Sequence, residues 1–474
     1  MKLLRHATAA FTANVATAAA QYALLLLVAR GLGPDAFGTF MFALTFGSLV
    51  AVLPNFGLDR IVVRQVVRER EAGSLWFAAA GVLRLGLGAI AMLVAALLLP
   101  AIAPPGQPFD TTLLIVLSLV VALAAELCRS VLYAFEALTL ETGLRVVGRA
   151  IMLAAAAMAL LAGRTLSQLA VGLAAAAIIE AVVYLQVTVR RLGLHRQWPS
   201  SQAVRSLFVS AAPIACHTLF VLLYFRTNLL IVASVAGTAA AGQFGAAFTF
   251  VQVLQVASGS LASVLLPHFV HRETEGPAAL ASRIDTATRL LLAGIVPAAA
   301  LLSLLAPEIV QIVYSSRFAA AAPALVVLAW APVFMFMGSL HGSLLIVLDA
   351  ERTLFWLSLV AAVVSVAANL VLIRWLGLLG ASLATVGTEA LVGLSCLALV
   401  RRRTGAPDAA AVAWPAVVAL AAVALVASGA QLPLTVRLLA ALGTAAASLL
   451  WMRLAGGPAW RSVQLVLTAR RAQA

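Results

Sequence analysis

Three arginines, Arg84, Arg129 and Arg226, lie inside long apolar stretches of the chain. A charged side chain at membrane depth is costly, so it usually faces a bundle interior or a water-filled cavity. Guanidinium groups pair with phosphate or carboxylate oxygens through parallel hydrogen bonds, so these residues suit the binding of an anion. A structural role stays open for each. Arg129 follows Glu126 by three residues, a spacing that permits an ion pair. Arg84 and Arg226 could form hydrogen bonds to a neighbouring helix, or extend their side chains so that the charged end reaches the membrane surface.

Neutral polar residues also fall within the apolar stretches, at Asn14, Asn228 and Asn369. Amides at such positions join neighbouring helices or contact a polar ligand. His268 and His271 have a spacing that could hold a metal, but no third ligand is evident. We therefore expect neither a metal site nor a cofactor.

Ionisable groups that could exchange a proton form a second set of candidates. Glu126, Glu180, Glu389 and His217 lie in apolar stretches, and each could couple a conformational change to proton movement. Each could instead make a structural hydrogen bond, which is also the simplest interpretation of His341.

The composition restricts the class of protein in which these residues act. Of 474 residues, 64% are hydrophobic and only 10% are charged, with a mean hydropathy of +1.08. Soluble domains are about half apolar and about one-quarter charged. The composition therefore excludes a soluble enzyme and favours an all-α polytopic membrane protein. No polar stretch is long enough for a separate catalytic domain, so we expect no enzyme activity.

About 20 apolar residues are needed to cross the hydrocarbon core of a membrane. Charge clusters, glycines and prolines divide the chain into fourteen candidate transmembrane helices, the first of them interpreted as an uncleaved span rather than a signal peptide. The predicted spans are 9–30, 37–57, 75–99, 112–133, 144–163, 167–189, 207–235, 243–267, 287–306, 321–347, 354–374, 378–400, 412–430 and 434–454.

The basic residues predict the orientation of these spans. With the N-terminus in the cytoplasm, and with residues near a span end counted with the adjoining side, 23 of the 31 Lys and Arg residues fall on the cytoplasmic side and 5 on the opposite side. The other 3 lie deeper within spans. Cytoplasmic loops carry an excess of Lys and Arg. Both termini are therefore expected in the cytoplasm, and the net charge of +14 reflects orientation rather than nucleic-acid binding.

An internal repeat predicts two similar halves. Residues 33–46 (GPDAFGTFMFALTF) and 237–250 (GTAAAGQFGAAFTF) match at seven of fourteen positions without a gap. They open the second and eighth spans, and an offset of six spans gives both copies the same orientation, as in parallel transporter repeats. We therefore predict two six-helix lobes, at 1–195 and 206–400, followed by a helix pair and a basic tail at 412–474.

Several short motifs resemble the oligosaccharide-lipid flippase, or Wzx-type polysaccharide synthesis, family of the multidrug/oligosaccharidyl-lipid/polysaccharide exporter superfamily. The similar segments are ARGLGPDAFG at 29–38, NFGLDR at 55–60, APEIV at 306–310, and NLVLI followed by LGLLGASLAT at 369–373 and 376–385, with Glu389 beyond. The resemblance covers nearly the whole chain.

This resemblance implies a two-lobed transporter that works by alternating access. It would move an isoprenoid-diphosphate-linked oligosaccharide, of the undecaprenyl type, between leaflets of the bacterial inner membrane. The product would feed a surface polysaccharide such as lipopolysaccharide O-antigen or an exopolysaccharide, with a polymerase and glycosyltransferases as further partners. Arg84, Arg129 and Arg226 would then contact the diphosphate, and Asn14 and Asn228 the substrate.

One departure from the family pattern affects the choice between related functions. Many relatives have Arg-x-Asp in the seventh span, where this chain has Arg226-Thr227-Asn228. A multidrug or cation antiporter would need an acidic residue in the cavity, and the first and seventh spans contain none. A lipid II flippase and a membrane-embedded glycosyltransferase or ligase are two more candidate functions, and the short outer loops disfavour the last.

Overall fold

The computed structural model describes residues 2–163, 165–193, 197–270, 277–405 and 433–454, and every regular element in these ranges is a helix. Eight stretches of the described chain are long and apolar enough to cross a membrane. The chain is thus an all-α polytopic membrane protein, as its composition predicts. The span predicted at 412–430 and the basic tail lie outside the described residues.

The described chain divides into two compact units, Met1–Gly245 and Ala246–Ala474. Helix α9 (Ser201–Ala236) packs against four helices of the N-terminal part of the chain, α2, α3, α4 and α5, which explains why it belongs to the first unit. The division into lobes at 1–195 and 206–400 with a terminal pair at 412–474 stays a prediction.

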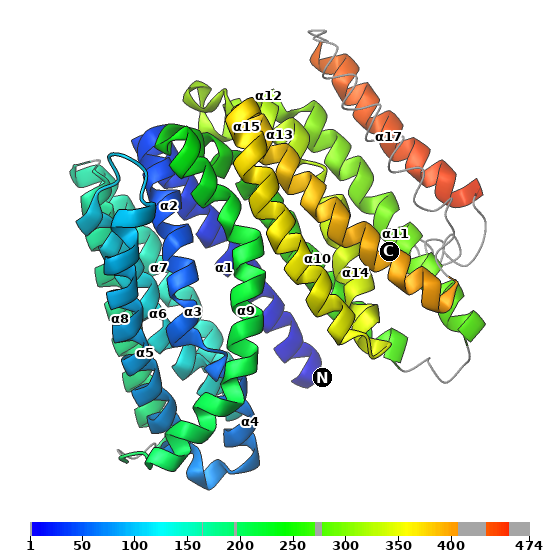
Figure 1. Cartoon of the computed structure of the whole chain (residues 1–474). Coiled ribbons are helices and arrows are strands. Elements are labelled where there is room, and N and C mark those ends of the chain that lie inside the picture. The colour runs from blue at the N-terminus through cyan, green and yellow to red at the C-terminus, as the bar shows by residue number, and fades with distance from the viewer. Residues whose placement is uncertain (1, 164, 194–196, 271–276, 406–432, 455–474) are drawn as a thin grey trace. The chain divides into compact units, whose positions relative to one another are not determined.

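The first unit holds α1 to α9 and the start of α10 (Figure 1). Within it α6 packs against α5, α7 and α8, and α1 packs against α7. Its elements are α1 (Lys2–Leu32), α2 (Pro34–Val50), α3 (Val52–Asn55), α4 (Leu58–Arg68), η1 (Arg70–Ala72), α5 (Gly73–Ile102), α6 (Phe109–Ala134), α7 (Leu138–Ala162), α8 (Leu166–Leu192), α9 (Ser201–Ala236) and α10 (Thr238–Val270).

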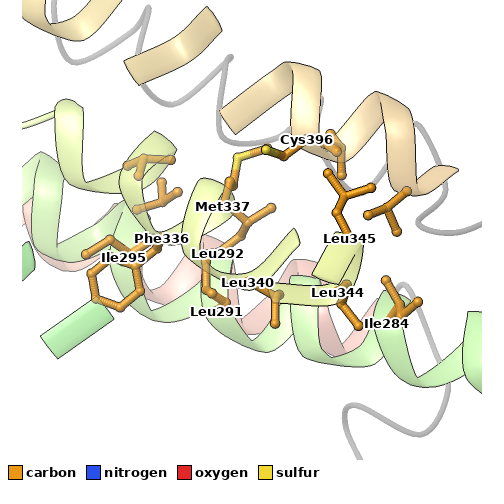
Figure 2. Packing of buried hydrophobic residues seen from close by; sticks show 14 of the residues in the cluster. Ile284, Leu291, Leu292, Ile295, Phe336, Met337, Leu340, Leu344, Leu345 and Cys396 are labelled. Carbon is orange, nitrogen blue, oxygen red and sulfur yellow. The ribbon is translucent and has the colours of Figure 1, made fainter. Parts of the chain in front are cut away.

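The second unit is built around three helices whose apolar side chains interlock. Met337 and Leu340 of α14 pack with Leu292 and Ile295 of α11 and with Cys396 of α15 (Figure 2). Its further elements are α11 (Pro277–Leu304), α12 (Ala306–Tyr314), η3 (Ser316–Phe318), α13 (Ala321–Leu328), α14 (Ala331–Val347), α15 (Glu351–Thr404) and α17 (Leu434–Leu454).

Glycine and proline set the breaks between helices. Gly33, with φ 85°, precedes Pro34 at the start of α2, and Gly237, with φ 88°, precedes α10 in the same way. These two turns are equivalent in the sequence repeat. Proline suits the first turn of a helix because no N–H is needed there, and glycine reaches positive φ without strain.

The long helix α15 contains two of the predicted spans. A helix from Glu351 to Thr404 would be about 80 Å long, far more than the roughly 30 Å hydrocarbon core. Its backbone leaves the helical conformation at Gly377 (φ 57°, ψ −129°), the residue at which the sequence predicts a linker.

The helices differ from the sequence-based expectation at several places, α4 and the span at 321–347 among them. α4 is an amphipathic helix in a stretch assigned to a loop. Its buried residues are Leu58, Ile61, Val62 and Val66, and Arg60 and Arg64 point outward. The span at 321–347 is divided into α13 and α14, and α14 begins at Ala331 with Pro332 in its first turn.

Candidate functional site

Arg84 is buried in α5, with 5% of its surface exposed, and its guanidinium group joins three elements. Nε donates to the carbonyl of Pro54 in α3 at 3.2 Å, and Nη1 donates to the carbonyl of Leu123 in α6. Nη2 donates to Oδ1 of Asp59 in α4 at 3.0 Å. All three nitrogens are therefore bound by the protein itself.

Asp59 extends this contact to a fourth side chain. The hydroxyl of Ser130 in α6 donates to Asp59 Oδ1 at 3.1 Å. Sequence reasoning missed Asp59, because 25 residues separate it from Arg84 and no local spacing links the two. Its carboxylate holds the start of α4 against α5 and α6.

Arg129 lies at the junction of α6, α7 and α8. Nη1 donates to Glu126 at 2.8 Å, as the spacing permits, and Nε lies 3.2 Å from a carboxylate oxygen of Glu141. The guanidinium carbon lies 5.8 Å from the ring centre of Tyr184 in α8, within the range of a cation–π contact. The ion pair with Glu126, left open by the sequence, is thus present.

Glu141 and Arg145 complete this buried network on α7. Glu141 is 1% exposed, and its two oxygens accept hydrogen bonds from Arg145 at 2.7 and 2.6 Å. Arg145 also donates to the hydroxyl of Tyr133. In the sequence analysis Arg145 is counted only as one of the cytoplasmic basic residues. Its i, i+4 spacing from Glu141 is the sequence signal that could have predicted this ion pair.

Arg226 differs from the other two arginines. It lies in α9, half-buried, and no hydrogen bond or ion pair joins it to another residue of the described chain. Tyr22 of α1 lies close enough to interact with it electrostatically. Asn228, two residues further along α9, is 5% exposed. Within the described residues this guanidinium group therefore lacks the carboxylate partner that Arg84 and Arg129 have.

The remaining candidates are dispersed. Glu180 of α8 packs against Gly148 of α7, where an added Cβ would lie 2.7 Å from its carboxylate. Glu389 is buried on α15 in the second unit, as is Asn369, whose amide donates to the carbonyl of Ser365 at 2.8 Å.

Of the histidines and Asn14, the structure describes the side-chain surroundings of His341. His341 is fully buried, with Nδ1 2.8 Å from the carbonyl of Met337 and Nε2 3.2 Å from the hydroxyl of Thr288. The side chains of Asn14, His217 and His268, and all of His271, lie outside the described residues. Among the residues that are described, no three His, Cys, Asp or Glu side chains form a metal-binding group.

The two copies of the repeat meet in the first unit at the starts of α2 and α10. A Cβ added to Gly38 would lie 1.7 Å from the carbonyl oxygen of Thr238, and one added to Gly242 would lie 1.9 Å from that of Pro34. These pairs are equivalent in the repeat, so the contact is nearly symmetric. The side chain of Thr238 also donates a hydrogen bond to Asp35. Only glycine permits backbones to approach this closely.

The profile of the family described as "Polysaccharide biosynthesis protein" matches residues 3–272, more than half of the chain. The chain belongs to the polysaccharide biosynthesis protein family. The resemblance to the polysaccharide synthesis family, which the sequence motifs indicate, is thereby confirmed. The matched residues include nearly all of the first unit.

Several solved structures share the fold of this chain. A lipid II flippase MurJ in an inward closed conformation aligns with 96% of this chain and 100% of its own, with a TM-score of 0.74 and 11% identity. An inward-facing multidrug resistance MATE family transporter of the MOP superfamily aligns over 82% and 94%, with a TM-score of 0.62 and 14% identity. The Vibrio cholerae MATE transporter VcmN in its bent form aligns over 84% and 97%, with a TM-score of 0.52 and 16% identity.

At these identities the likeness concerns the fold, which is that of membrane transporters. None of the curated proteins compared with the chain matches it by sequence.

Proposed function

We propose that this protein is a flippase that moves an isoprenoid-diphosphate-linked oligosaccharide from the inner to the outer leaflet for surface polysaccharide synthesis. The family match over residues 3–272 carries the proposal, and the transporter fold supports it. The protein would act by transport rather than by catalysis. Its partners would be the lipid-linked saccharide and the glycosyltransferases and polymerase that make and use it.

Arg226 is the proposed contact for the diphosphate. Its guanidinium group has no hydrogen-bonding or ionic partner in the described chain, so it can pair with phosphate oxygens. Asn228 on the same helix is proposed to assist. Arg84 and Arg129 are held by Asp59, Glu126 and Glu141, and a phosphate would have to displace these contacts.

Alternating access would require the helix starts around Gly38 and Gly242 to come together and separate during the cycle. Their tight backbone contact supports this role, because it creates one well-defined closed arrangement. Glu180 and Glu389 remain proposed coupling residues, together with Glu126 and His217, although Glu126 is already paired with Arg129.

The protein is proposed to lie in the bacterial inner membrane with both ends in the cytoplasm. The distribution of the 31 basic residues supports this orientation.

A deletion strain tests the proposal. Loss of the gene is expected to abolish surface glycan and to leave lipid-linked repeat units in the inner leaflet. Wild-type protein should restore export, Arg226→Ala should not, and Arg374→Ala, at an exposed arginine, serves as the matched control. Normal surface glycan together with altered drug resistance would overturn the proposal. Accumulation of a peptidoglycan precursor instead would favour a lipid II flippase.

A further inference from the structure

A cavity of about 400 Å³ lies on the first unit, between α5 and α8. Leu127 and Cys128 of α6 form its buried base. Its walls include the exposed apolar side chains of Leu85 on α5 and of Val182 and Leu185 on α8. We call this cavity the α5–α8 groove. Its size is in the range of small-molecule sites, which are about 300–1,000 Å³.

The lining of the groove selects a hydrocarbon ligand. Its charged lining residue is Arg84, and the guanidinium nitrogens of that residue already donate to Pro54, Leu123 and Asp59. The arginine therefore offers the groove its alkyl stem rather than its charge. Apolar walls whose charged residue is already bound by the protein favour an alkyl chain over a sugar or a phosphate.

One end of the groove has the chemistry of a membrane interface. Gln197, Trp198 and Pro199 line it there, and the Trp198 side chain is 84% exposed. Tryptophan is enriched at the level of lipid headgroups. Residues 190–205 on either side of this tryptophan contain four arginines and no acidic residue. Of these, Arg190, Arg191 and Arg205 are described, and all three reach the surface. Such a basic segment attracts anionic lipid headgroups.

The length of the groove distinguishes between two kinds of lipid. Its α5 wall runs from Phe77 to Leu85, which corresponds to about 12 Å of helix. That is less than half of a hydrocarbon core of roughly 30 Å, so the groove lies within one leaflet. It covers most of the depth that one acyl chain spans in a leaflet, and it is far too short for a long polyisoprenyl chain.

We propose that the α5–α8 groove binds one acyl chain of a resident anionic phospholipid, with the headgroup held at Trp198 and the neighbouring arginines. The site is separate from Arg226, and the proposal does not depend on which substrate the protein transports. The bound lipid would fill the space between α5 and α8 that protein side chains leave open.

Two glycines of α5 supply a matched pair of variants. A Cβ at Gly81 or at Gly86 would meet no atom within 4 Å, but Gly81 lines the groove and Gly86 does not. Leucine is a better helix former than glycine, so neither substitution should impair folding of the helix. Gly81→Leu fills the groove with a side chain, whereas Gly86→Leu adds the same side chain outside it.

The full-length protein and both variants would be purified in a mild detergent, and the lipid retained by each would be identified by native mass spectrometry. Wild-type protein and Gly86→Leu are expected to retain an anionic phospholipid such as phosphatidylglycerol, and Gly81→Leu is expected to lose it. Added phosphatidylglycerol should raise the melting temperature of wild-type protein more than phosphatidylcholine does, and it should not raise that of Gly81→Leu.

Replacing Arg190, Arg191 and Arg205 with glutamine should remove the preference for the anionic headgroup while a phospholipid is still retained. Equal retention by Gly81→Leu and wild-type protein would overturn the proposal. So would the absence of any preference for phosphatidylglycerol in the wild-type protein, or displacement of its lipid by a polyisoprenyl phosphate.

Discussion

The backbone contact between the starts of α2 and α10 makes a sharp prediction for Gly38. In Gly38→Ala the new Cβ would lie 1.7 Å from the carbonyl oxygen of Thr238, and in Gly242→Ala it would lie 1.9 Å from that of Pro34. A backbone carbonyl in a helix cannot swing away as a flexible side chain does. Either substitution therefore forces the two helix starts apart.

The size of the effect follows from the cost of overpacking. Inserting a methyl group into a close-packed site typically costs about 1–3 kcal/mol. Because this cost applies only while the helix starts touch, it should shift the balance between the touching and separated states by about 5- to 150-fold. Alanine also stabilises a helix by about 1 kcal/mol relative to glycine, but it does so in both states.

Cross-linking measures this balance directly. In a variant without Cys128, Cys216 and Cys396, cysteines would replace Asp35 and Thr238, whose side chains are hydrogen-bonded. A short cross-linker should join them readily, and adding Gly38→Ala or Gly242→Ala should strongly reduce the yield.

Gly143→Ala in α7 is the control, because a Cβ there meets no atom within 4 Å, and it should leave the yield unchanged. An unchanged yield in Gly38→Ala would refute the reasoning.

The ion pairs and the break in α15 give three further predictions. Asp59→Ala leaves the buried Arg84 without its carboxylate and should lower the free energy of unfolding by about 3–5 kcal/mol, seen as a lower melting temperature. Glu141→Gln should destabilise the protein by a similar amount, about 3–5 kcal/mol, and adding Arg145→Met should recover part of that loss; no recovery would argue against direct pairing. Gly377→Ala places a side chain at φ 57° and should cost about 1–3 kcal/mol, and an unchanged melting temperature would contradict the strained conformation.

Sequence patterns predict the helices well where apolar length decides the structure. A run of about 20 apolar residues is long enough to cross a membrane as a helix, so its secondary structure is easily predicted. The linker at Gly377 and the repeated turns at Gly33 and Gly237 are also visible in the sequence as local signals. The helix α4 is missed because its charged residues suggest a loop. The spacing of Leu58, Ile61, Val62 and Val66 nevertheless fits one face of a helix.

The charged network shows where sequence reasoning ends. The pair of Glu126 and Arg129 is local, and so is that of Glu141 and Arg145, which is harder to recognise because it lies at the edge of an apolar run. The pairing of Arg84 with Asp59 depends on how α4, α5 and α6 pack, and nothing in a single sequence specifies that packing. For the same reason the sequence does not distinguish Arg226 from the two paired arginines.

Translocation by the purified protein tests the central claim most directly. Full-length protein would be placed in liposomes that contain a fluorescent isoprenoid-diphosphate-linked saccharide, and a membrane-impermeant quencher would report the leaflet that the lipid occupies. Wild-type protein is predicted to exchange the labelled lipid between leaflets, Arg374→Ala to do so equally, and Arg226→Ala to fail although it is folded. No exchange by the wild-type protein, or equal exchange by Arg226→Ala, would contradict the account.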